Sequence, residues 1–191
     1  HQSDVTFDFY GKDAKMIIHN KTVEKWKVTL IDTGLETQTG GRLKRIESFI
    51  KNEPFMVTYG DAVADIDIRK LVDFHLAHKK SVTVTAVSQP GRFGILEFGH
   101  GDEVKSFKEK PSSDSNVING GFFVLNPDAL KYITKGDSAL WEDEPLEQLA
   151  KKKQLQGYKH QGFWKCMDTL RDKKILEELW KSGKAPWKIW D

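Results

Sequence analysis

A short apolar run, Phe55–Tyr59, limits the folds open to this chain more than any other segment, because Pro54 and Gly60-Asp61 bound it on either side. Such a run is typical of a strand buried on both faces of a sheet. Asp67 can cap an amphipathic helix that follows, and residues 81–87 are β-branched and strand-like. A strand, a helix and a second strand predict a βαβ unit, and therefore an α/β fold with parallel strands and a right-handed crossover.

The rest of the chain supplies short elements on both sides of this unit. Alternating apolar and polar residues predict strands, and helical spacing of apolar residues predicts helices. The predicted strands are 5–10, 15–18, 27–31 and 121–125, with a hairpin over 93–98 and 103–107, and the predicted helices are 42–50, 68–76, 144–152 and 168–181. Because no repeat, low-complexity stretch or Ser/Pro-rich linker interrupts the chain, we expect a single domain over residues 1–191.

Composition excludes several classes of function. The net charge of +2 is too small an excess for a protein that binds nucleic acid by neutralising phosphates. No run approaches the roughly 18 to 20 apolar residues of a membrane-spanning helix, and residues 1–10 lack the apolar stretch of a signal peptide. The single cysteine, Cys166, excludes a disulfide framework and a Cys-rich zinc site. We therefore expect a cytoplasmic protein that binds neither nucleic acid nor membrane.

Two acidic residues far apart in the sequence form the first candidate site. Asp61 follows the predicted strand 55–59 and so belongs to the carboxyl-terminal edge of a parallel sheet, where ligands bind in open α/β folds. Asp168 stands at the start of a predicted helix. Two carboxylates from different elements can hold one Mg²⁺, which takes water and phosphate oxygens at its other positions. The alternatives are an ordinary Gly-Asp turn at Asp61 and a helix N-cap at Asp168.

Three further segments carry polar groups suited to a phosphorylated ligand. Lys108-Glu109-Lys110 offers cations for phosphate and a carboxylate for sugar hydroxyls, or else is a solvated charged turn. Asn119-Gly120-Gly121 enters an apolar strand and can present amides to a polar ligand, or else forms a β-bulge. Thr39-Gly40-Gly41-Arg42 runs into a helix, where backbone amides and a guanidinium favour anions.

Asp65-Ile66-Asp67 supports a rival interpretation. A DxD motif binds the metal and the diphosphate in many glycosyltransferases. Here it runs directly into a predicted helix, so capping also explains Asp67. A metal-dependent glycosyltransferase that uses Asp65 and Asp67 and a non-catalytic binding fragment therefore remain as alternatives.

In chain order, these motifs resemble those of a known family. They are Thr39-Gly40-Gly41-Arg42-Leu43-Lys44-Arg45, Tyr59-Gly60-Asp61, Pro90-Gly91-Arg92-Phe93-Gly94, Phe107-Lys108-Glu109-Lys110-Pro111, Asn119-Gly120-Gly121-Phe122-Phe123, Met167-Asp168-Thr169 and Ala185-Pro186-Trp187-Lys188. Over essentially its whole length, the sequence resembles the glucose-1-phosphate cytidylyltransferases, also called CDP-glucose pyrophosphorylases, which are sugar nucleotidyltransferases.

The resemblance implies a fold and a reaction. The fold is a Rossmann-like three-layer α/β sandwich with a mixed, mainly parallel sheet. The reaction transfers a cytidylyl group from CTP to α-D-glucose 1-phosphate and gives CDP-glucose and pyrophosphate, with Mg²⁺ as cofactor. The family works as oligomers in the bacterial synthesis of CDP-deoxysugars and of the O-antigen of lipopolysaccharide.

The resemblance also assigns roles to residues by motif. Asp61 and Asp168 are the metal ligands, and Lys110 acts with them in catalysis. The remaining assignments are nucleotide contacts at Thr37, Thr39, Gly40, Gly41, Arg42 and Gly60, and contacts with the sugar phosphate at Glu109, Lys110, Asn119 and Gly120.

The sequence departs from the family pattern at one point. The family begins with a strand, a GGxGTR-type loop and a downstream lysine that hold the triphosphate, and the 191 residues contain none of them. The resemblance therefore implies a chain without the first βα units, which carries the metal and sugar half of the site. We expect such a chain to be weakly active or inactive alone. Because the loss exposes a sheet edge and apolar surface, we also expect it to form a homo-oligomer.

Overall fold

The computed structural model describes residues 5–10, 15–19, 26–88, 95–98, 103–108 and 117–190. The chain separates into two compact units, His1–Asp32 and Thr33–Asp191. In the first unit, β1 (Val5–Asp8) pairs antiparallel with β2 (Lys15–Ile18). Two of the predicted strands are thus confirmed, whereas the predicted strand 27–31 is wrong, because that stretch forms no strand. The single domain over residues 1–191 stays a prediction.

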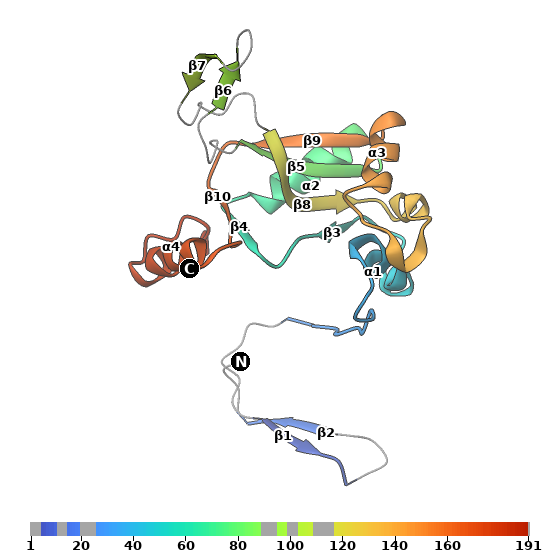
Figure 1. The fold of residues 1–191 in the computed structure, drawn as a ribbon. Helices are drawn as coiled ribbons and strands as arrows, with labels where there is room; N and C mark the ends of the chain where they lie inside the picture. The colour runs from blue at the N-terminus through green and yellow to red at the C-terminus, as the bar shows by residue number, and fades with distance from the viewer. Residues whose placement is uncertain are drawn as a thin grey trace. The chain divides into compact units, whose positions relative to one another are not determined.

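A four-stranded sheet forms the centre of the second unit (Figure 1). Its strands lie in the order β3 (Phe55–Val57), β8 (Val117–Leu125), β5 (Val82–Ser88) and β9 (Leu155–His160). β8 is antiparallel to both of its neighbours, while β5 and β9 are parallel. β3, β5 and β9 therefore run in one direction and β8 in the other, which confirms a mixed sheet in which most strands share one direction.

The predicted βαβ unit is present, although its two strands do not touch. β3 leads through α2 (Ile68–His78) to β5, and both strands point the same way because both are antiparallel to β8. β8 comes later in the chain and lies between them. Asp67 caps α2 as predicted, since its carboxylate accepts a hydrogen bond of 3.1 Å from the amide of Lys70.

Apolar side chains alternate along β8 and divide the core into two parts. Phe123 and Leu125 pack in a core with residues of the helices α1 (Thr39–Arg45), η2 (Pro127–Tyr132) and α3 (Glu144–Lys151). Val124, which lies between them, packs with Leu71 of α2 in a second core. Helices therefore cover both faces of the sheet, which confirms the three-layer α/β architecture.

The remaining helices are α1 (Thr39–Arg45), η1 (Glu47–Phe49), η2 (Pro127–Tyr132), η3 (Gly136–Ser138), α3 (Glu144–Lys151) and α4 (Leu170–Lys181), of which η1, η2 and η3 are 3-10 helices. α3 and α4 lie within two residues of the predicted ranges 144–152 and 168–181. The predicted helix 42–50 is divided between α1, which begins three residues earlier, and η1, and η3 was not predicted. Across the described part of the chain, no helix has the length and apolar character needed to cross a membrane.

Two small antiparallel pairs complete the second unit. β6 (Ile95–Phe98) and β7 (Val104–Lys108) form the predicted hairpin. β4 (Ala62–Ala64) pairs with β10 (Trp164–Cys166), a pairing that the sequence did not predict.

Candidate active site

β4 and β10 bring together the segments that carry Asp61 and Asp168. Ala62 lies opposite Cys166, and the amide of Met167 donates a hydrogen bond of 2.7 Å to the carbonyl oxygen of Asp61. Asp168 is the next residue after Met167. Both acidic residues are exposed, and Asp168 Oδ2 accepts a hydrogen bond from Cys166 Sγ at 3.2 Å. The ladder therefore brings the two segments together, and the sharing of one metal ion by the two carboxylates stays a prediction.

The helix after Asp168 begins with a capping box. Thr169 is the N-cap: its hydroxyl accepts a hydrogen bond from the amide of Asp172, and the Asp172 carboxylate accepts one from the amide of Thr169. The alternative interpretation of Asp168 as the helix cap is therefore wrong. Asp168 lies just outside α4, between the capping box and the end of β10.

A buried ion pair holds this turn against β10. Asp172 is buried, and its Oδ1 accepts a hydrogen bond of 2.7 Å from the Nζ of Lys165, which lies in β10. The hydrogen bond from Lys165, helped by those from Thr169, lowers the pKa of Asp172 to about 2. The charged Asp172 therefore ties β10 to the first turn of α4, on either side of Asp168.

The donor atoms of this pair of acidic residues fit magnesium. Asp61 and Asp168 offer carboxylate oxygens, which Mg²⁺ prefers, and Mg²⁺ commonly takes one or two protein carboxylates beside water and phosphate oxygens. The described residues include no group of three or more His, Cys, Asp or Glu side chains that could hold a metal ion. An open site of this kind suits an ion that binds together with a nucleotide's phosphates.

Glu142, which lies outside the predicted site, joins three of its segments. Its carboxylate accepts hydrogen bonds from the hydroxyl of Thr39 at 2.7 Å and from the hydroxyl of Tyr59 at 2.5 Å. Asn119 Nδ2 also donates to the Tyr59 hydroxyl, at 3.4 Å. Burial and the hydrogen bond to Glu142 raise the pKa of Tyr59, so its phenol stays protonated and acts as a donor.

The Gly-Gly loop makes contacts that its sequence did not predict. Gly40 and Gly41 are buried, and both amides donate to the carbonyl oxygen of Ala139, at 2.9 and 3.1 Å. A Cβ at Gly40 would lie 2.9 Å from that oxygen, so only glycine lets the two backbones approach this closely. These helix-terminal amides are therefore bonded within the protein. Thr37 is buried as well, and contact of this loop with a nucleotide stays a prediction.

Arg42 and Gly60 remain accessible to a ligand. The guanidinium of Arg42 is exposed and donates to Thr33 Oγ1 at 2.6 Å and to the carbonyl oxygen of Leu35 at 3.1 Å, which fixes its direction. Gly60 is exposed, and a Cβ built there meets nothing within 4 Å. Their predicted roles beside the nucleotide are compatible with these surroundings.

The predicted sugar segment is described only at its second half. Asn119 is exposed near the start of β8, and the carbonyl oxygen of Gly120 accepts a hydrogen bond of 2.7 Å from Trp164 Nε1 of β10. Because Tyr59 contacts Asn119, the end of β3 and the start of β8 share one edge of the sheet. Glu109 and Lys110 lie outside the described residues.

Comparison with known proteins identifies the family. The nucleotidyl transferase family profile matches residues 11–172. Glucose-1-phosphate cytidylyltransferase of Salmonella typhimurium is 53% identical over 192 residues, which cover 100% of this chain and 73% of that protein. The chain belongs to the glucose-1-phosphate cytidylyltransferase family. A probable glucose-1-phosphate cytidylyltransferase of Bacillus subtilis is 40% identical over 87% of this chain and 65% of its own length.

Solved structures agree with this family in fold. A putative glucose-1-phosphate thymidylyltransferase from Bacillus anthracis superposes with a TM-score of 0.57 and 19% identity, over 83% of this chain and 64% of that one. A UDP-glucose pyrophosphorylase complexed with UDP-glucose gives a TM-score of 0.57 and 18% identity, over 79% and 64% of the two chains. At these identities the likeness supports the nucleotidyltransferase fold alone.

The motif Asp65-Ile66-Asp67, on which the glycosyltransferase alternative rests, contacts other parts of this cytidylyltransferase family member. Asp67 caps α2, and its partner in the helix is the amide of Lys70. Asp65 Oδ1 lies 3.0 Å from His160 Nε2 at the end of β9. Capping therefore accounts for Asp67, whereas Asp65 Oδ1 is buried and, among the described residues, receives no hydrogen bond.

Sequence reasoning missed several residues that shape the site of this cytidylyltransferase family member. Glu142, Lys165 and Asp172 belong to no motif, and only their tertiary contacts show what they do. His75 was not singled out as a site residue from the sequence, but it is buried, with Nδ1 2.8 Å from Thr83 Oγ1. Its position in an amphipathic helix did carry a signal, because it is one turn from the buried Leu71.

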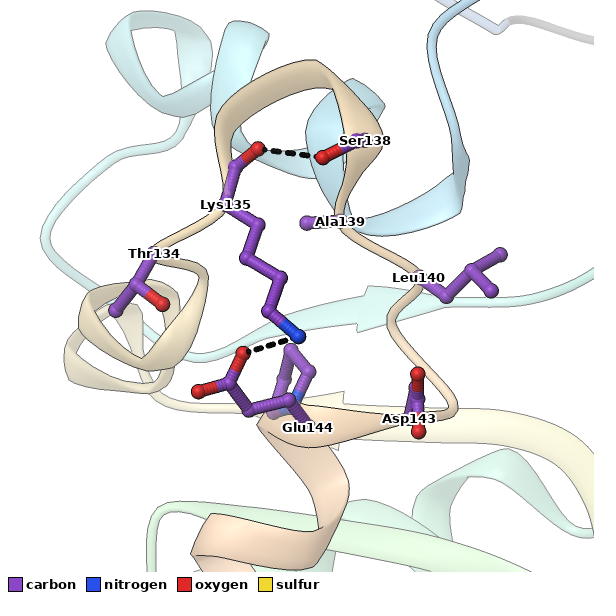
Figure 2. Close-up of a pocket in the computed structure, with 8 residues that line it drawn as sticks. Thr134, Lys135, Ser138, Ala139, Leu140, Asp143 and Glu144 are labelled. Carbon is purple, nitrogen blue, oxygen red and sulfur yellow. Dashed lines mark hydrogen bonds and ion pairs between the residues drawn. The ribbon is translucent and has the colours of Figure 1, made fainter.

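A surface pocket of the cytidylyltransferase family member lies beside the first turn of α3 (Figure 2). Lys135 reaches across it to Glu144, with 3.0 Å between Nζ and Oε2. None of the predicted site residues lines this pocket. The pocket therefore does not belong to the candidate active site.

Proposed function

We propose that this protein catalyses the transfer of a cytidylyl group from CTP to α-D-glucose 1-phosphate, with release of pyrophosphate and formation of CDP-glucose. The observation that carries this proposal is the 53% identity to glucose-1-phosphate cytidylyltransferase of Salmonella typhimurium over the whole chain. The pairing of the segments that carry Asp61 and Asp168, at the end of the β4–β10 ladder, is compatible with it.

The reaction needs no covalent intermediate on the enzyme. A phosphate oxygen of glucose 1-phosphate attacks the α-phosphorus of CTP in line. The bond between that phosphorus and the oxygen that joins it to the β-phosphorus breaks, and pyrophosphate leaves with this oxygen. The protein therefore contributes by placing the two substrates and by balancing their charge.

Asp61 and Asp168 would hold Mg²⁺ in this proposal. When bound, Mg²⁺ neutralises negative charge on the phosphate groups of the substrates. Asp172 and Lys165 keep the turn that carries Asp168 against β10, the strand that pairs with the segment after Asp61.

The other proposed contacts divide between the two substrates. Arg42, with the Thr37–Gly41 loop and the accessible backbone at Gly60, binds the nucleotide. Asn119 and Gly120, with Glu109 and Lys110, bind the sugar and its phosphate, and Lys110 supplies a positive charge beside the reacting phosphate.

We also propose that the protein acts as a homo-oligomer in the cytoplasm, in CDP-deoxysugar and O-antigen lipopolysaccharide synthesis. Exposed apolar side chains support association: Phe7 and Met16 of the β1–β2 hairpin are 57% and 58% exposed, and Leu170 of α4 is 76% exposed. A single cysteine suits a reducing compartment.

Calorimetry and a turnover assay test the proposed function. We expect the 191-residue chain to bind CDP-glucose in the presence of Mg²⁺ more tightly than UDP-glucose or dTDP-glucose. Pyrophosphate release from CTP, UTP and dTTP with glucose 1-phosphate then measures activity and base preference in the same chain. Absence of both CDP-glucose binding and pyrophosphate release would overturn the proposal, and binding without turnover would favour the non-catalytic alternative.

A further inference from the structure

We propose that Glu142 is a positioning residue that aligns the nucleotide segment and the sugar segment of the active site with each other. This inference rests on the proposed function, because it concerns how the two proposed substrate segments are held. Glu142 would act through Thr39 and Tyr59 without touching either substrate.

The first observation is the bridging geometry of the Glu142 carboxylate. Its Oε2 accepts from the hydroxyl of Thr39 at 2.7 Å, and its Oε1 accepts from the hydroxyl of Tyr59 at 2.5 Å. Each oxygen thus holds one segment, and hydrogen bonds to an ionised acceptor are shorter and stronger than neutral ones. A change at Glu142 would remove a hydrogen bond from each segment at once.

The second observation is that both partners are anchored to the site. The Thr39 hydroxyl also accepts a hydrogen bond of 2.9 Å from the amide of Trp141, so its own position is fixed from two directions. Tyr59 directly precedes Gly60-Asp61, and its hydroxyl accepts a hydrogen bond from the side-chain amide of Asn119. The bridge therefore links the start of α1 to the proposed metal ligand Asp61 and to the proposed sugar residue.

The third observation is that the rings around the bridge are tightly packed. A Cβ at Gly121, which has φ of +71°, would lie 3.0 Å from the Tyr59 ring, so the ring rests directly on that backbone. Phe123 packs edge-on against both Tyr59 and Trp141, with ring centroids 6.0 Å apart in each pair. Trp141 is buried and carries Glu142 as the next residue. The carboxylate is therefore presented from a rigid core.

The alternative is that the bridge only stabilises the fold. If the role is structural, a change at Glu142 would weaken the binding of every ligand and would also lower the melting temperature. A positioning role affects chiefly a ligand that touches both segments, because only such a ligand senses how they are placed relative to each other. CDP-glucose spans both segments, whereas CMP and glucose 1-phosphate each touch one of them.

The decisive experiment measures binding of these three ligands to Glu142→Gln. The amide keeps the size of the side chain and one acceptor oxygen but loses the second, charged one. We expect the Kd for CDP-glucose to rise at least about tenfold, while the Kd values for CMP and for glucose 1-phosphate change less than about threefold. Where turnover is measured, kcat falls and the KM values change little.

Two further variants complete the design. Tyr59→Phe removes the hydroxyl that donates a hydrogen bond to Glu142, so we expect it to raise the Kd for CDP-glucose as Glu142→Gln does. We expect the double variant to bind CDP-glucose no more weakly than the weaker-binding single variant. Glu144→Gln is the matched control, since this carboxylate pairs with Lys135 at 3.0 Å in the pocket of Figure 2 and contacts no proposed site residue. It should bind all three ligands as the unchanged chain does.

The outcomes separate this inference from the proposed function. Unchanged CDP-glucose binding in Glu142→Gln, or an equal loss for all three ligands with a lower melting temperature, would overturn the positioning role and leave the proposed function standing. Failure of the unchanged chain to bind CDP-glucose and to release pyrophosphate would overturn the proposed function and this inference with it.

Discussion

The amide of Met167 donates a hydrogen bond of 2.7 Å to the carbonyl oxygen of Asp61, which sets the residue before Asp168 directly against its proposed partner. Backbones in a paired ladder lie about 5 Å apart, and long side chains reach further than that. Backbone bonds alone therefore hold together the two segments that carry Asp61 and Asp168, which are about a hundred residues apart in the sequence.

We predict that Asp61→Asn and Asp168→Asn each weaken the effect of Mg²⁺ on CDP-glucose binding. An amide lacks the charge that holds the ion, so saturation should require at least about tenfold more Mg²⁺. Calorimetric titrations at several Mg²⁺ concentrations measure this. Asp67→Asn is the matched control, because asparagine caps a helix as well as aspartate does. An effect of Asp67→Asn larger than that of Asp61→Asn would instead favour the glycosyltransferase interpretation.

We predict that Asp172 contributes stability that is lost in acid. Its pKa is lowered from 3.8 to about 2 in the folded chain, so the unfolded chain binds the proton first as the pH falls. The contribution is therefore complete above pH 3.8 and disappears as the pH falls through about 2. Asp172→Asn should lower the melting temperature at neutral pH and flatten its dependence on pH in this window.

A second variant, Lys165→Met, tests the other side of the ion pair that holds the turn before α4. Lys165→Met removes the partner of Asp172 and should reproduce the loss, since a buried carboxylate is then left without its cation. Thermal melts followed by circular dichroism measure both variants. Equal pH profiles for the unchanged chain and Asp172→Asn would contradict the prediction.

We predict that Gly40→Ala destabilises the fold by about 1 to 3 kcal/mol, the usual cost of forcing extra atoms into packed structure. Its Cβ would lie 2.9 Å from the carbonyl oxygen of Ala139, and that oxygen also accepts hydrogen bonds from the amides of Gly40 and Gly41. Gly157→Ala is the control, because its Cβ meets only the Cβ of Ala86 at 3.9 Å. Urea unfolding of the two variants gives the difference, and equal midpoints would count against the close-approach argument.

We predict that His75 makes the fold sensitive to mild acid. Burial lowers its pKa below 6.5, so the unfolded chain takes up the proton more readily. Stability is thus present above pH 6.5 and declines as the pH falls through the lower folded value. His78, whose ring centroid lies 5.2 Å away, has a pKa lowered by burial too and adds to this effect.

His75→Gln measures the share of this one residue. Glutamine keeps hydrogen-bonding groups for Thr83 and Asn126 but does not titrate. Its melting temperature should vary less between about pH 7 and pH 5 than that of the unchanged chain. A steeper dependence in the variant would refute the assignment.

The order of strand, helix and strand in the central βαβ unit was predictable from local chemistry, and Asp67 has the side chain that α2 requires at its start. The prediction that Phe55–Tyr59 is buried on both faces of the sheet is wrong. β3 is an edge strand, where Phe55 and Val57 pack partly against the core and Met56 is 42% exposed. β9, at the other edge, was missed because Leu155–His160 contains mostly polar residues and is only half-buried.

The candidate site was predictable where residues follow strand ends and not where separate segments meet. Asp61 and Asn119 could be proposed because each adjoins an apolar strand. Glu142 gave no signal, because its partners are supplied by residues far away in the sequence. The Gly-Gly pair indicated a close approach, but only the fold shows that the approaching backbone is that of Ala139.

The place of β8 between β3 and β5 dictates an order of assembly. Phe55 pairs with Leu125 and Val82 pairs with the same residue, so neither earlier strand has its partner until the chain has been made as far as Leu125. During synthesis, β3, α2 and β5 leave the ribosome before β8, with the edges that β8 will pair with still open. The addition of β8 between β3 and β5 then completes both pairings. A nascent chain that stops before Leu125 therefore leaves the facing edges of β3 and β5 unpaired, and chaperones would bind it in this incomplete state.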